Sequence, residues 1–513
     1  MSTWRQAKWN EPLIYEIGGR GRIGYLVPEV DEEIKNVVGS IEELIPKKLL
    51  RKELPELPEL SEVEVVRHFT RLTQMSYGVD QGPVPLGSCT MKYNPKICEE
   101  LASDPRITEL HPYQDEDTVQ GLLEILYKLQ EWLAEITGMD YCTLQPAAGA
   151  AGELTGCLII RKYHELKGEK QRIEMIVPDN AHGSNPASAA MVGFKVVRLP
   201  TREDGCIDLE ALKYVVSDKT AGLMLTNPNT LGLFEKDIKE IARIVHDVGG
   251  LLYYDGANLN GILGVVRPGD MGFDIVHINI HKTFSTPHGG GGPGAGPICV
   301  KKELVDLLPR PLLKYDGKKY YWDYECKHCI GRVRAFYGNI IPLVKAFTYI
   351  LSLGPQGLRE VAEQSVINTN YFISLMKDSK GYSLPYDPER PRKHEVVYSA
   401  KPLTRDYGVT AEDVAKNLLD HGLYAPTIYF PLIVEEALMI EFTDTETKEN
   451  IEYYAKVLKD IEEKAKANAK ELKEAPRNTS VGRINYVKAN HPRTVTPTYR
   501  VLRLRNKGVQ LRL

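Results

Sequence analysis

Short apolar runs alternate with amphipathic stretches through the middle of this chain, and this alternation limits the fold more than any other feature. The runs have the length of strands, while the stretches between them carry apolar residues at helical spacing. Strands that alternate with helices predict a mainly parallel sheet covered on both faces. The expected strands are 141–144, 173–177, 195–199, 222–226, 251–254, 275–280 and 297–300. The prediction is therefore an α/β fold with a mainly parallel seven-stranded sheet.

Helices are expected between and after these strands. Apolar residues from Leu122 to Ile136 recur at three- and four-residue spacing and stop at Gly138, a residue type that commonly ends a helix. Further helices are expected at 208–216, 236–248, 340–354 and 357–377. A smaller αβ unit follows, built from HEVVYSA, the helix AEDVAKNLLDHG, the strand ALMIEF and a charged helix from Thr447 to about Glu471.

The two ends of the chain have a different character. The first hundred residues are punctuated by Pro and Gly and show little periodicity, as an arm or lid would. The basic, Pro-containing C-terminus has the composition of a surface tail. We expect an N-terminal arm at 1–115, a large domain at 116–355, a small C-terminal domain at 356–473 and a tail at 474–513.

Composition excludes some classes of function. The formal net charge is -4, whereas a nucleic-acid partner would call for a concentrated basic face, so none is expected. No apolar run is long enough to span a bilayer, and the N-terminal MSTWRQAKWNEP lacks the apolar core of a signal peptide. A cytoplasmic location without a membrane partner is expected.

Eight cysteines in 513 residues do not indicate a disulfide framework, because most of them lie inside apolar segments as small core residues do. Cys326 and Cys329 form a CxxC without a second pair at zinc-ribbon spacing. A local disulfide or two ordinary thiols therefore fits this pair better than a metal site, and no metal is expected.

The run HINIHKTFSTPHGGGGPGAGP contains Lys282, the residue on which the expected chemistry depends. Lys282 follows an apolar strand, and α/β enzymes place polar functional residues at such strand ends. An ordinary lysine would be a solvated surface group, whereas one at a strand end could form a Schiff base if its surroundings lower its pKa. The glycines Gly289 to Gly292 would let the backbone approach a ligand or a neighbouring subunit, although such a run is commonly a flexible loop.

Three other features accompany this lysine. Asp255 ends an apolar strand, where it is either a helix cap or a carboxylate held ionised against a buried cation. His182 heads a turn after a strand, as a capping or surface residue or as a ring laid over a flat cofactor. In QPAAGAAGEL, small residues precede a helix that begins near Gly149. This stretch is either a close-packed helix start or an anion site formed by backbone N–H groups.

The order of the four features fits one cofactor, pyridoxal 5'-phosphate (PLP). A PLP site needs an amine to hold the aldehyde, an anion site for the phosphate and a flat contact on the ring. It also needs an acid that keeps the pyridine nitrogen protonated, so that the ring acts as an electron sink. Each feature alone is ambiguous, but together they predict a PLP enzyme.

Several motifs resemble those of glycine decarboxylase, the P-protein of the glycine cleavage system. They are HINIHKTFSTPHGGGGPGAGP, LGSCTMKYNP, HPYQDEDTVQG, AHGSNPAS, TNPNTLGLFE and VRAFYGN. The chain is more narrowly similar to the lysine-bearing second subunit of the two-subunit form, because the single-chain form is nearly twice as long. The resemblance implies a fold type I PLP enzyme of the aspartate-aminotransferase type.

The resemblance also implies roles for single residues. Lys282 would hold the cofactor as an internal aldimine, Asp255 would meet the pyridine nitrogen and His182 would stack on the ring. The further expected cofactor neighbours are Ala148, Gly149 and Ala150 at the phosphate, His281 and Thr283 beside the lysine, and Asn227 and Asn229 at the ring edge.

The implied reaction is the decarboxylation of glycine, with release of CO2 and transfer of the aminomethyl group to the lipoyl arm of H-protein. The implied partners are a homologous, lysine-free first subunit in an α2β2 assembly and lipoylated H-protein.

Two alternatives for the function stay open. Another PLP enzyme of this fold, such as an amino-acid decarboxylase or a cysteine desulfurase, would share Lys282, Asp255 and His182 and act without H-protein. A catalytically silent subunit that binds H-protein is the other.

Overall fold

The computed structural model describes residues 4–24, 28–53, 57–287, 292–491, 495 and 498–508, and of Arg505 only the backbone. Its contacts divide the chain into two units, which we describe separately. The main unit is Gly78–Glu474, and the terminal unit consists of Met1–Tyr77 and Ala475–Leu513. These two units do not correspond to the four domains expected from the sequence, whose limits at 115, 355 and 473 stay predictions.

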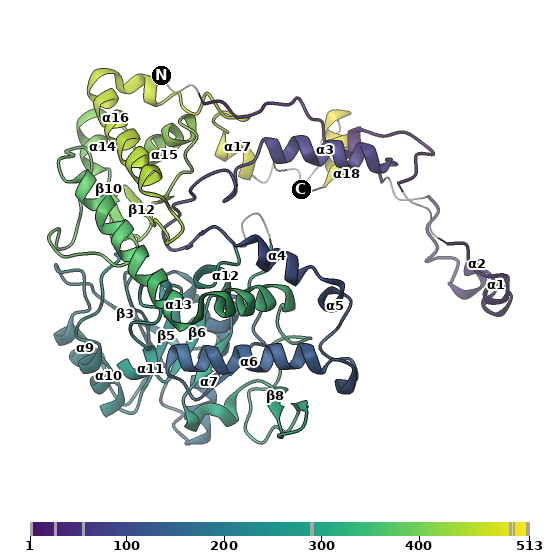
Figure 1. Cartoon of the computed structure of the whole chain (residues 1–513), viewed down its shortest axis with the longest axis horizontal. Coiled ribbons are helices and arrows are strands. Elements are labelled where there is room, and N and C mark those ends of the chain that lie inside the picture. The colour runs from purple at the N-terminus through teal and green to yellow at the C-terminus, as the bar shows by residue number, and fades with distance from the viewer. Residues whose placement is uncertain are drawn as a thin grey trace. The chain divides into compact units, whose positions relative to one another are not determined.

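A seven-stranded sheet is the framework of the main unit (Figure 1). In spatial order its strands are β1 (Tyr141–Thr143), β7 (Ile298–Val300), β6 (Ile275–Ile278), β5 (Leu251–Gly256), β4 (Thr220–Thr226), β2 (Glu174–Pro178) and β3 (Lys195–Leu199). Strands from β6 to β3 pair in parallel, whereas β7 is antiparallel to both β6 and β1. The predicted α/β fold with a mainly parallel seven-stranded sheet is confirmed.

Helices cover both faces of this sheet, and alternate residues of one strand contact different helices. Along β5, Tyr253 shares a buried cluster with Ile160 of α7, while Leu252 and Tyr254 share another with Ile241 of α10. Because both faces are covered, β4 and β5 are buried at every position, and this explains their continuous apolar sequences. The helices are α6 (Gln120–Thr137), α7 (Gly149–Leu166), α8 (Ser184–Met191), α9 (Leu209–Val215), α10 (Ile238–Asp247), η3 (Leu259–Gly261), α11 (Pro268–Met271), α12 (Ile280–Thr283) and η4 (Lys302–Leu307).

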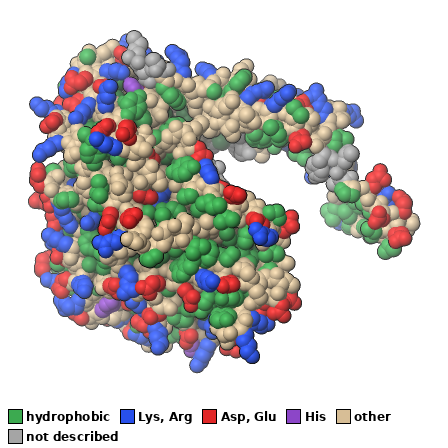
Figure 2. Space-filling view, in the orientation of Figure 1, with side chains coloured by type: hydrophobic (Ala, Val, Ile, Leu, Met, Phe, Trp, Pro, Cys, Tyr) green, Lys and Arg blue, Asp and Glu red, His purple; other side chains and the backbone are tan. Residues whose placement is uncertain are grey.

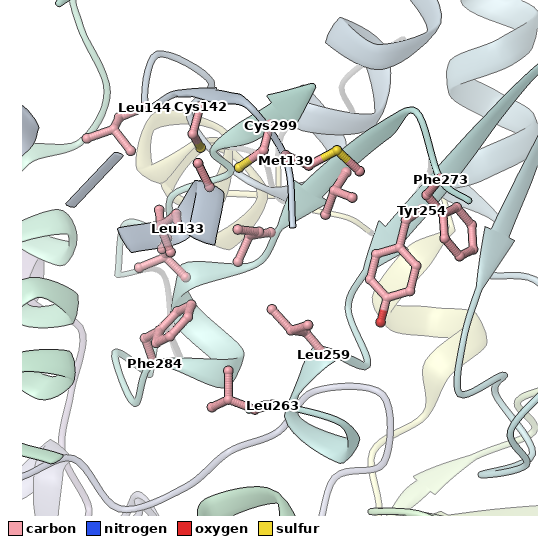
Figure 3. Packing of buried hydrophobic residues seen from close by; sticks show 14 of the residues in the cluster. Leu133, Met139, Cys142, Leu144, Tyr254, Leu259, Leu263, Phe273, Phe284 and Cys299 are labelled. Carbon is pink, nitrogen blue, oxygen red and sulfur yellow. The ribbon is translucent and has the colours of Figure 1, made fainter. Parts of the chain in front are cut away.

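Helix α6 follows its sequence pattern closely. Its apolar stripe, which includes Leu126 and Leu133, is buried, and the helix ends at Gly138 with a left-handed backbone (φ 69°) as predicted. Figure 3 shows Leu133 in the core near Cys142 of β1 and Cys299 of β7, which are paired across those strands. Helix α6 therefore packs against the edge strand β1.

A second, smaller sheet lies in the C-terminal part of the main unit. Its order is β10 (Val396–Ser399), β12 (Ala437–Ile440) and β11 (Thr427–Ile428), with antiparallel pairing throughout. It is accompanied by α14 (Lys401–Tyr407), α15 (Ala411–Asp420) and α16 (Lys448–Leu472). The predicted smaller αβ unit is therefore present. The remaining elements of the main unit are α4 (Lys96–Ala102), α5 (Pro105–Thr108), η2 (Glu116–Thr118), β8 (Leu312–Tyr315) and β9 (Tyr320–Asp323).

The two helices predicted at 340–354 and 357–377 are both present within α13 (Ile340–Met376), which a kink at Gly354 divides. Gly354 interrupts it with a backbone that is not helical (φ 63°, ψ −179°), and Pro355 follows. Buried apolar side chains lie on both sides of the kink, so each of the two helices packs against the main unit.

Hydrophobic side chains gather on the face formed by α6 and α13 (Figure 2). A groove of about 320 Å³ lies there, lined mainly by Trp132, Ile136, Ile350, Leu351, Pro355 and Leu358. None of the predicted site residues lines it. In the part of the chain that the structure describes, no helix combines the length and apolar character that a membrane crossing requires.

The terminal unit corrects one expectation. Its elements are η1 (Ile14–Glu16), α1 (Glu32–Val38), α2 (Ile41–Leu44), α3 (Glu62–Gln74), α17 (Tyr486–Asn490) and α18 (Tyr499–Asn506). The prediction of irregular structure is wrong for α3, which begins with a capping box between Ser61 and Glu64. The described residues of the C-terminal segment from 477 onward are mostly exposed, as expected of a surface tail, and Tyr499 stacks on Tyr15 with ring centroids 4.6 Å apart.

Candidate active site

The carboxyl ends of the parallel strands bring the predicted residues together. Asp255 lies at the end of β5, and Lys282 lies in α12 directly after β6. His182 lies between β2 and α8. The charges of Asp255 and Lys282 both act on the pKa of His182, which is lowered mainly by burial. Three of the four features singled out in the sequence are therefore neighbours in space.

Asp255 is held in one orientation by its surroundings and is only 2% exposed. Asn185 donates from Nδ2 to Oδ2 at 2.7 Å, and the backbone N–H of Ala257 donates to Oδ1 at 2.9 Å. His277 Nε2 lies 3.4 Å from Oδ1. The carboxylate is thus fixed by two hydrogen-bond donors, one from α8 and one from the backbone after its own strand, with the His277 ring of the neighbouring strand beside it.

These donors keep Asp255 ionised. Burial raises its pKa, but His277, the Asn185 hydrogen bond and the Lys282 charge outweigh burial, and the pKa lies below its usual value. A buried, ionised carboxylate at a strand end can hold a protonated ring nitrogen against it. This is the geometry that the cofactor prediction requires of Asp255.

Lys282 is half-buried and stands among several ionisable groups. Burial is the largest influence on the pKa of Asp255, Glu153 and Glu441, and the Lys282 charge opposes it in each case by favouring the ionised form. Its neighbour Thr283 has a buried hydroxyl without a hydrogen-bond partner among the described residues. An unpartnered hydroxyl beside the lysine is available to an anionic ligand.

The start of α7 has the form expected of an anion site. The helix begins at Gly149, and the preceding Ala148 provides no side-chain cap for its first N–H groups. A Cβ on Gly149 would lie 2.3 Å from Asn279 Nδ2, and one on Gly296 would lie 2.0 Å from the Ala148 carbonyl. The glycines are therefore required for close packing here, while Ala150 at the next position is exposed.

His182 belongs to a short hydrogen-bonded chain that ends in a buried acid. Its Nδ1 lies 2.5 Å from Ser184 Oγ, which in turn lies 2.9 Å from Glu153 Oε1. The Ser184 backbone N–H also donates to Nδ1 at 3.2 Å. Burial and the charge of Asp255 raise the pKa of Glu153 to about 8. Protein atoms around the His182 ring lower its pKa, but the residue as a whole keeps exposed surface through which a flat ligand can contact it.

The other predicted cofactor neighbours have partners within the protein. His281 Nδ1 accepts a weak hydrogen bond of 3.4 Å from the Ala295 backbone. Asn227 Oδ1 accepts from the Glu235 backbone N–H, and Asn229 Nδ2 donates to Glu235 Oε1. These bonds give Asn227 and Asn229 a structural part in the turn after β4, and their contact with the ring edge stays a prediction.

Sequence reasoning missed three residues of this site: His277, Asn185 and Glu153. His277 could have been found from strand register, because it pairs directly with Asp255 across the parallel strands β5 and β6. Asn185 lies in the AHGSNPAS motif that also contains His182. Glu153 gives no signal in the sequence, since a glutamate on the fifth residue of a helix is ordinarily exposed.

A second polar cluster was also missed. Buried His394, Glu395 and Glu441 each direct one nitrogen or oxygen toward the others, and these atoms lie within 4.8 Å of one another. The segment LGSCTMKYNP reaches this cluster, since the backbone N–H groups of Ser88 and Thr90 donate to Glu395 and Glu441. The Lys282 charge acts on the pKa of both glutamates, after the larger effect of burial.

Two other sequence features have definite outcomes. Of the glycines from Gly289 to Gly292, the first three lie outside the described residues. Cys326 and Cys329 are joined by a disulfide, which was one of the two alternatives for this pair. The VRAFYGN segment follows the disulfide, and its Asn339 donates to the carbonyls of Ala147 and Gly294 beside the start of α7.

Two family models match the chain. The model described as "Glycine cleavage system P-protein" matches residues 32–315, and the model described as "Glycine dehydrogenase, C-terminal domain" matches residues 361–481. The first alone spans more than half of the chain.

Known proteins agree with these models. A protein of Staphylothermus marinus, "Probable glycine dehydrogenase (decarboxylating) subunit 2", is 64% identical over 510 residues, or 97% of this chain and 98% of the relative. A protein of Aeropyrum pernix with the same name is 61% identical over 516 residues, or 98% and 99%. A crystal structure of glycine decarboxylase (P-protein) of the glycine cleavage system, in inhibitor-bound form, matches with a TM-score of 0.71 and 22% identity. That match covers 85% of this chain and 100% of the other, and at this identity it shows the fold alone.

Proposed function

The chain belongs to the glycine cleavage system P-protein family, as a relative of subunit 2 of the decarboxylating glycine dehydrogenase, and from this premise we propose that it transfers the aminomethyl group of glycine to the lipoyl arm of H-protein. It is an enzyme of glycine decarboxylation with the fold of fold type I PLP enzymes. The transfer step, the cofactor contacts and the assembly are what the proposal adds.

One observation carries the proposal: a buried, ionised Asp255 lies at the strand end that faces the charge of Lys282. PLP, when bound, would supply an acceptor for the electron pair released as the bond from Cα to the carboxylate breaks. Lys282 would hold the cofactor aldehyde, and Asp255 would keep the ring nitrogen protonated.

The remaining residues position the cofactor. The N–H groups at Ala148, Gly149 and Ala150, with the unpartnered Thr283 hydroxyl, would hold the phosphate. His182 would lie on the ring, with its Nδ1 held by Ser184. His281 would support Lys282 from the same short helix.

The second-subunit relationship implies a first subunit as partner. We propose an α2β2 assembly with that subunit and a docking surface for lipoylated H-protein. The cytoplasmic location expected from the sequence is part of the same proposal. A catalytically silent scaffold would not require an ionised acid buried beside a lysine. A cysteine desulfurase would act without H-protein.

The proposal can be tested by co-expression with a candidate first subunit. We expect a complex with the visible absorbance of bound PLP and with glycine-dependent exchange of labelled CO2 that requires lipoylated H-protein. Lys282→Ala should abolish the exchange and the absorbance that survives gel filtration. Lys302→Ala, at an exposed lysine after β7, should leave both unchanged. Full exchange by Lys282→Ala, or exchange without H-protein, would contradict the proposal.

A further inference from the structure

The buried carboxyls of Glu395 and Glu441 face each other because of strand register. Val396 of β10 pairs with Ile440 of β12 in antiparallel register, so the next residue outward on each strand is a glutamate. Both side chains are at most 1% exposed. Two carboxylates opposite one another in a buried setting repel strongly, and they do not both ionise at neutral pH.

The hydrogen bonds of the pair are unequal. Glu395 accepts at both oxygens, from Asn258 Nδ2 at 2.9 Å and from the Ser88 N–H at 2.8 Å. Glu441 accepts twice at Oε2, from the N–H and the hydroxyl of Thr90, both at 3.0 Å. Glu441 Oε1 is buried and has no partner among the described residues. A proton on this oxygen would therefore compete with no hydrogen-bond donor already bound there.

The charged groups around the pair are Lys282 of α12, Lys92 of the segment that carries Ser88 and Thr90, His394, and the thiol of Cys89. Burial and the charges of Lys282 and Lys92 lower the pKa of His394 to about 3, so this ring is neutral. Burial raises the pKa of Glu441 to about 7 and that of Glu395 well above its usual range, against the Lys282 charge. The two ammonium groups also disfavour a bound metal cation, and a shared proton is the better account of the cluster.

The proposed reaction has a use for such a proton. When the bond from Cα to the carboxylate breaks, CO2 leaves, and the electron pair forms a new bond between Cα and one sulfur of the lipoyl disulfide. The S–S bond then breaks, and the second sulfur leaves as a thiolate that must take up one proton. Glycine supplies the electrons and no other reductant is needed, but the site has to supply the proton.

We propose that Glu441, paired with Glu395, is the acid that gives this proton to the leaving lipoyl sulfur and takes it back in the reverse reaction. The inference rests on the proposed function, because it assigns the acid of that same transfer. Glu153 is a less suitable donor, since Ser184 lies between it and His182. Glu441 has an oxygen without a partner among the described residues, and its charge acts on the neighbouring thiol of Cys89, which is half-buried.

Infrared spectra of the full chain, titrated without glycine or H-protein, test the shared proton directly. We expect a carboxylic-acid C=O component that disappears with a midpoint near pH 7 and is absent from Glu441→Gln, separate from the components of Glu153 and Glu395, whose pKa values are raised further. The amide oxygen of glutamine can still accept from Thr90, so the fold should be retained. The control is Glu462→Gln, because Glu462 is 5% exposed but bonds Ser379 and Lys466 and has a lowered pKa. Glu462→Gln should keep the component, and its persistence in Glu441→Gln would overturn the proposal.

Single-turnover transfer from glycine to lipoylated H-protein tests the role of the proton. With the complete complex, Glu441→Gln should slow transfer about 100-fold and remove its dependence on pH near 7, as loss of a general acid does. Glu441→Asp should restore part of the rate. Unchanged rate and pH profile in Glu441→Gln would overturn the assignment. An inactive wild type would instead refute the proposed function, while the infrared result would still decide whether the pair holds a proton.

Discussion

Glu153 shows how one buried acid can make the stability of the site depend on pH. Its pKa is raised to about 8 in the folded protein by burial and by Asp255, whereas an unfolded glutamate titrates near 4.3. A carboxyl with a raised pKa favours folding below the unfolded value, and this contribution is lost as pH rises toward the folded value. The main unit should therefore lose stability between about pH 5 and pH 8 because of this residue.

Glu153→Gln removes the titrating group but keeps a hydrogen-bonding side chain next to Ser184. We expect little change in the free energy of unfolding at pH 5 and a gain of about 1 kcal/mol or more at pH 8, relative to the wild type. Denaturant unfolding at the two pH values measures this. A variant that is destabilised equally at both would show that Glu153 acts only through packing.

Single residues were predictable from sequence where they stand at the end of an element. Asp255 and Lys282 were found because each follows a buried apolar run, and the structure places both at the carboxyl edge of the sheet. His277 was missed because it lies inside an apolar strand, where only the pairing with β5 reveals its contact with Asp255. The catalytic role of each residue is still a prediction.

At the scale of elements, periodicity predicted most of the main unit well. The expected strand at 275–280 ends earlier, at Ile278, because the chain turns there into α12, the helix of Lys282. Helix α3 was not predicted, although Ser61 and Glu64 have the spacing of a capping box. The prolines before the helix indicated an irregular segment instead. The capping-box signal at the start of α3 is nevertheless present in the local sequence.

The kink in α13 provides a test at this scale. Gly354 has φ 63° and ψ −179°, a backbone region that essentially only glycine adopts and that costs a residue with a Cβ about 1–3 kcal/mol, although no other atom lies within 4 Å of the added methyl group. We expect Gly354→Ala to lower the free energy of unfolding by about 1–3 kcal/mol. Gly121→Ala, in the regular helix α6 with equal space, should instead raise it by a few tenths. Chemical denaturation distinguishes the two, and equal effects would contradict the strain at Gly354.

At the scale of the whole main unit, the long-range contacts could not be predicted. Ser88 is 307 positions from Glu395, and Thr90 is 351 positions from Glu441, yet they are hydrogen-bonded. No local periodicity carries information over such separations. The motif LGSCTMKYNP was noticed only through its resemblance to a family, and its contacts with the small sheet appear only in three dimensions. The hydrogen bonds of Glu395 and Glu441 to this segment could therefore not be predicted from the sequence.

Lys92 of this segment joins distant parts of the main unit and yields the last prediction. Its side chain is fully buried and donates from Nζ to Asn260 Oδ1 at 2.9 Å, to Tyr349 Oη at 3.2 Å and to Asp444 Oδ1 at 3.2 Å. Burial lowers its pKa, but Asp444 and Tyr349 outweigh burial, so the amine stays charged.

Lys92→Met should leave Asp444 without its cation in a site that is largely closed to water. Breaking one side of a buried pair costs about 3–5 kcal/mol, and we expect this loss in the free energy of unfolding. Lys96→Met removes an exposed pair with Asp80 and should cost about 0–1 kcal/mol. The double variant Lys92→Met with Asp444→Asn should recover part of the loss, because no buried charge is then left unpaired. Denaturant unfolding of the wild type and the three variants measures these free energies. The two lysine substitutions each remove one positive charge and differ in burial, so an equal loss of unfolding free energy in both would contradict this account.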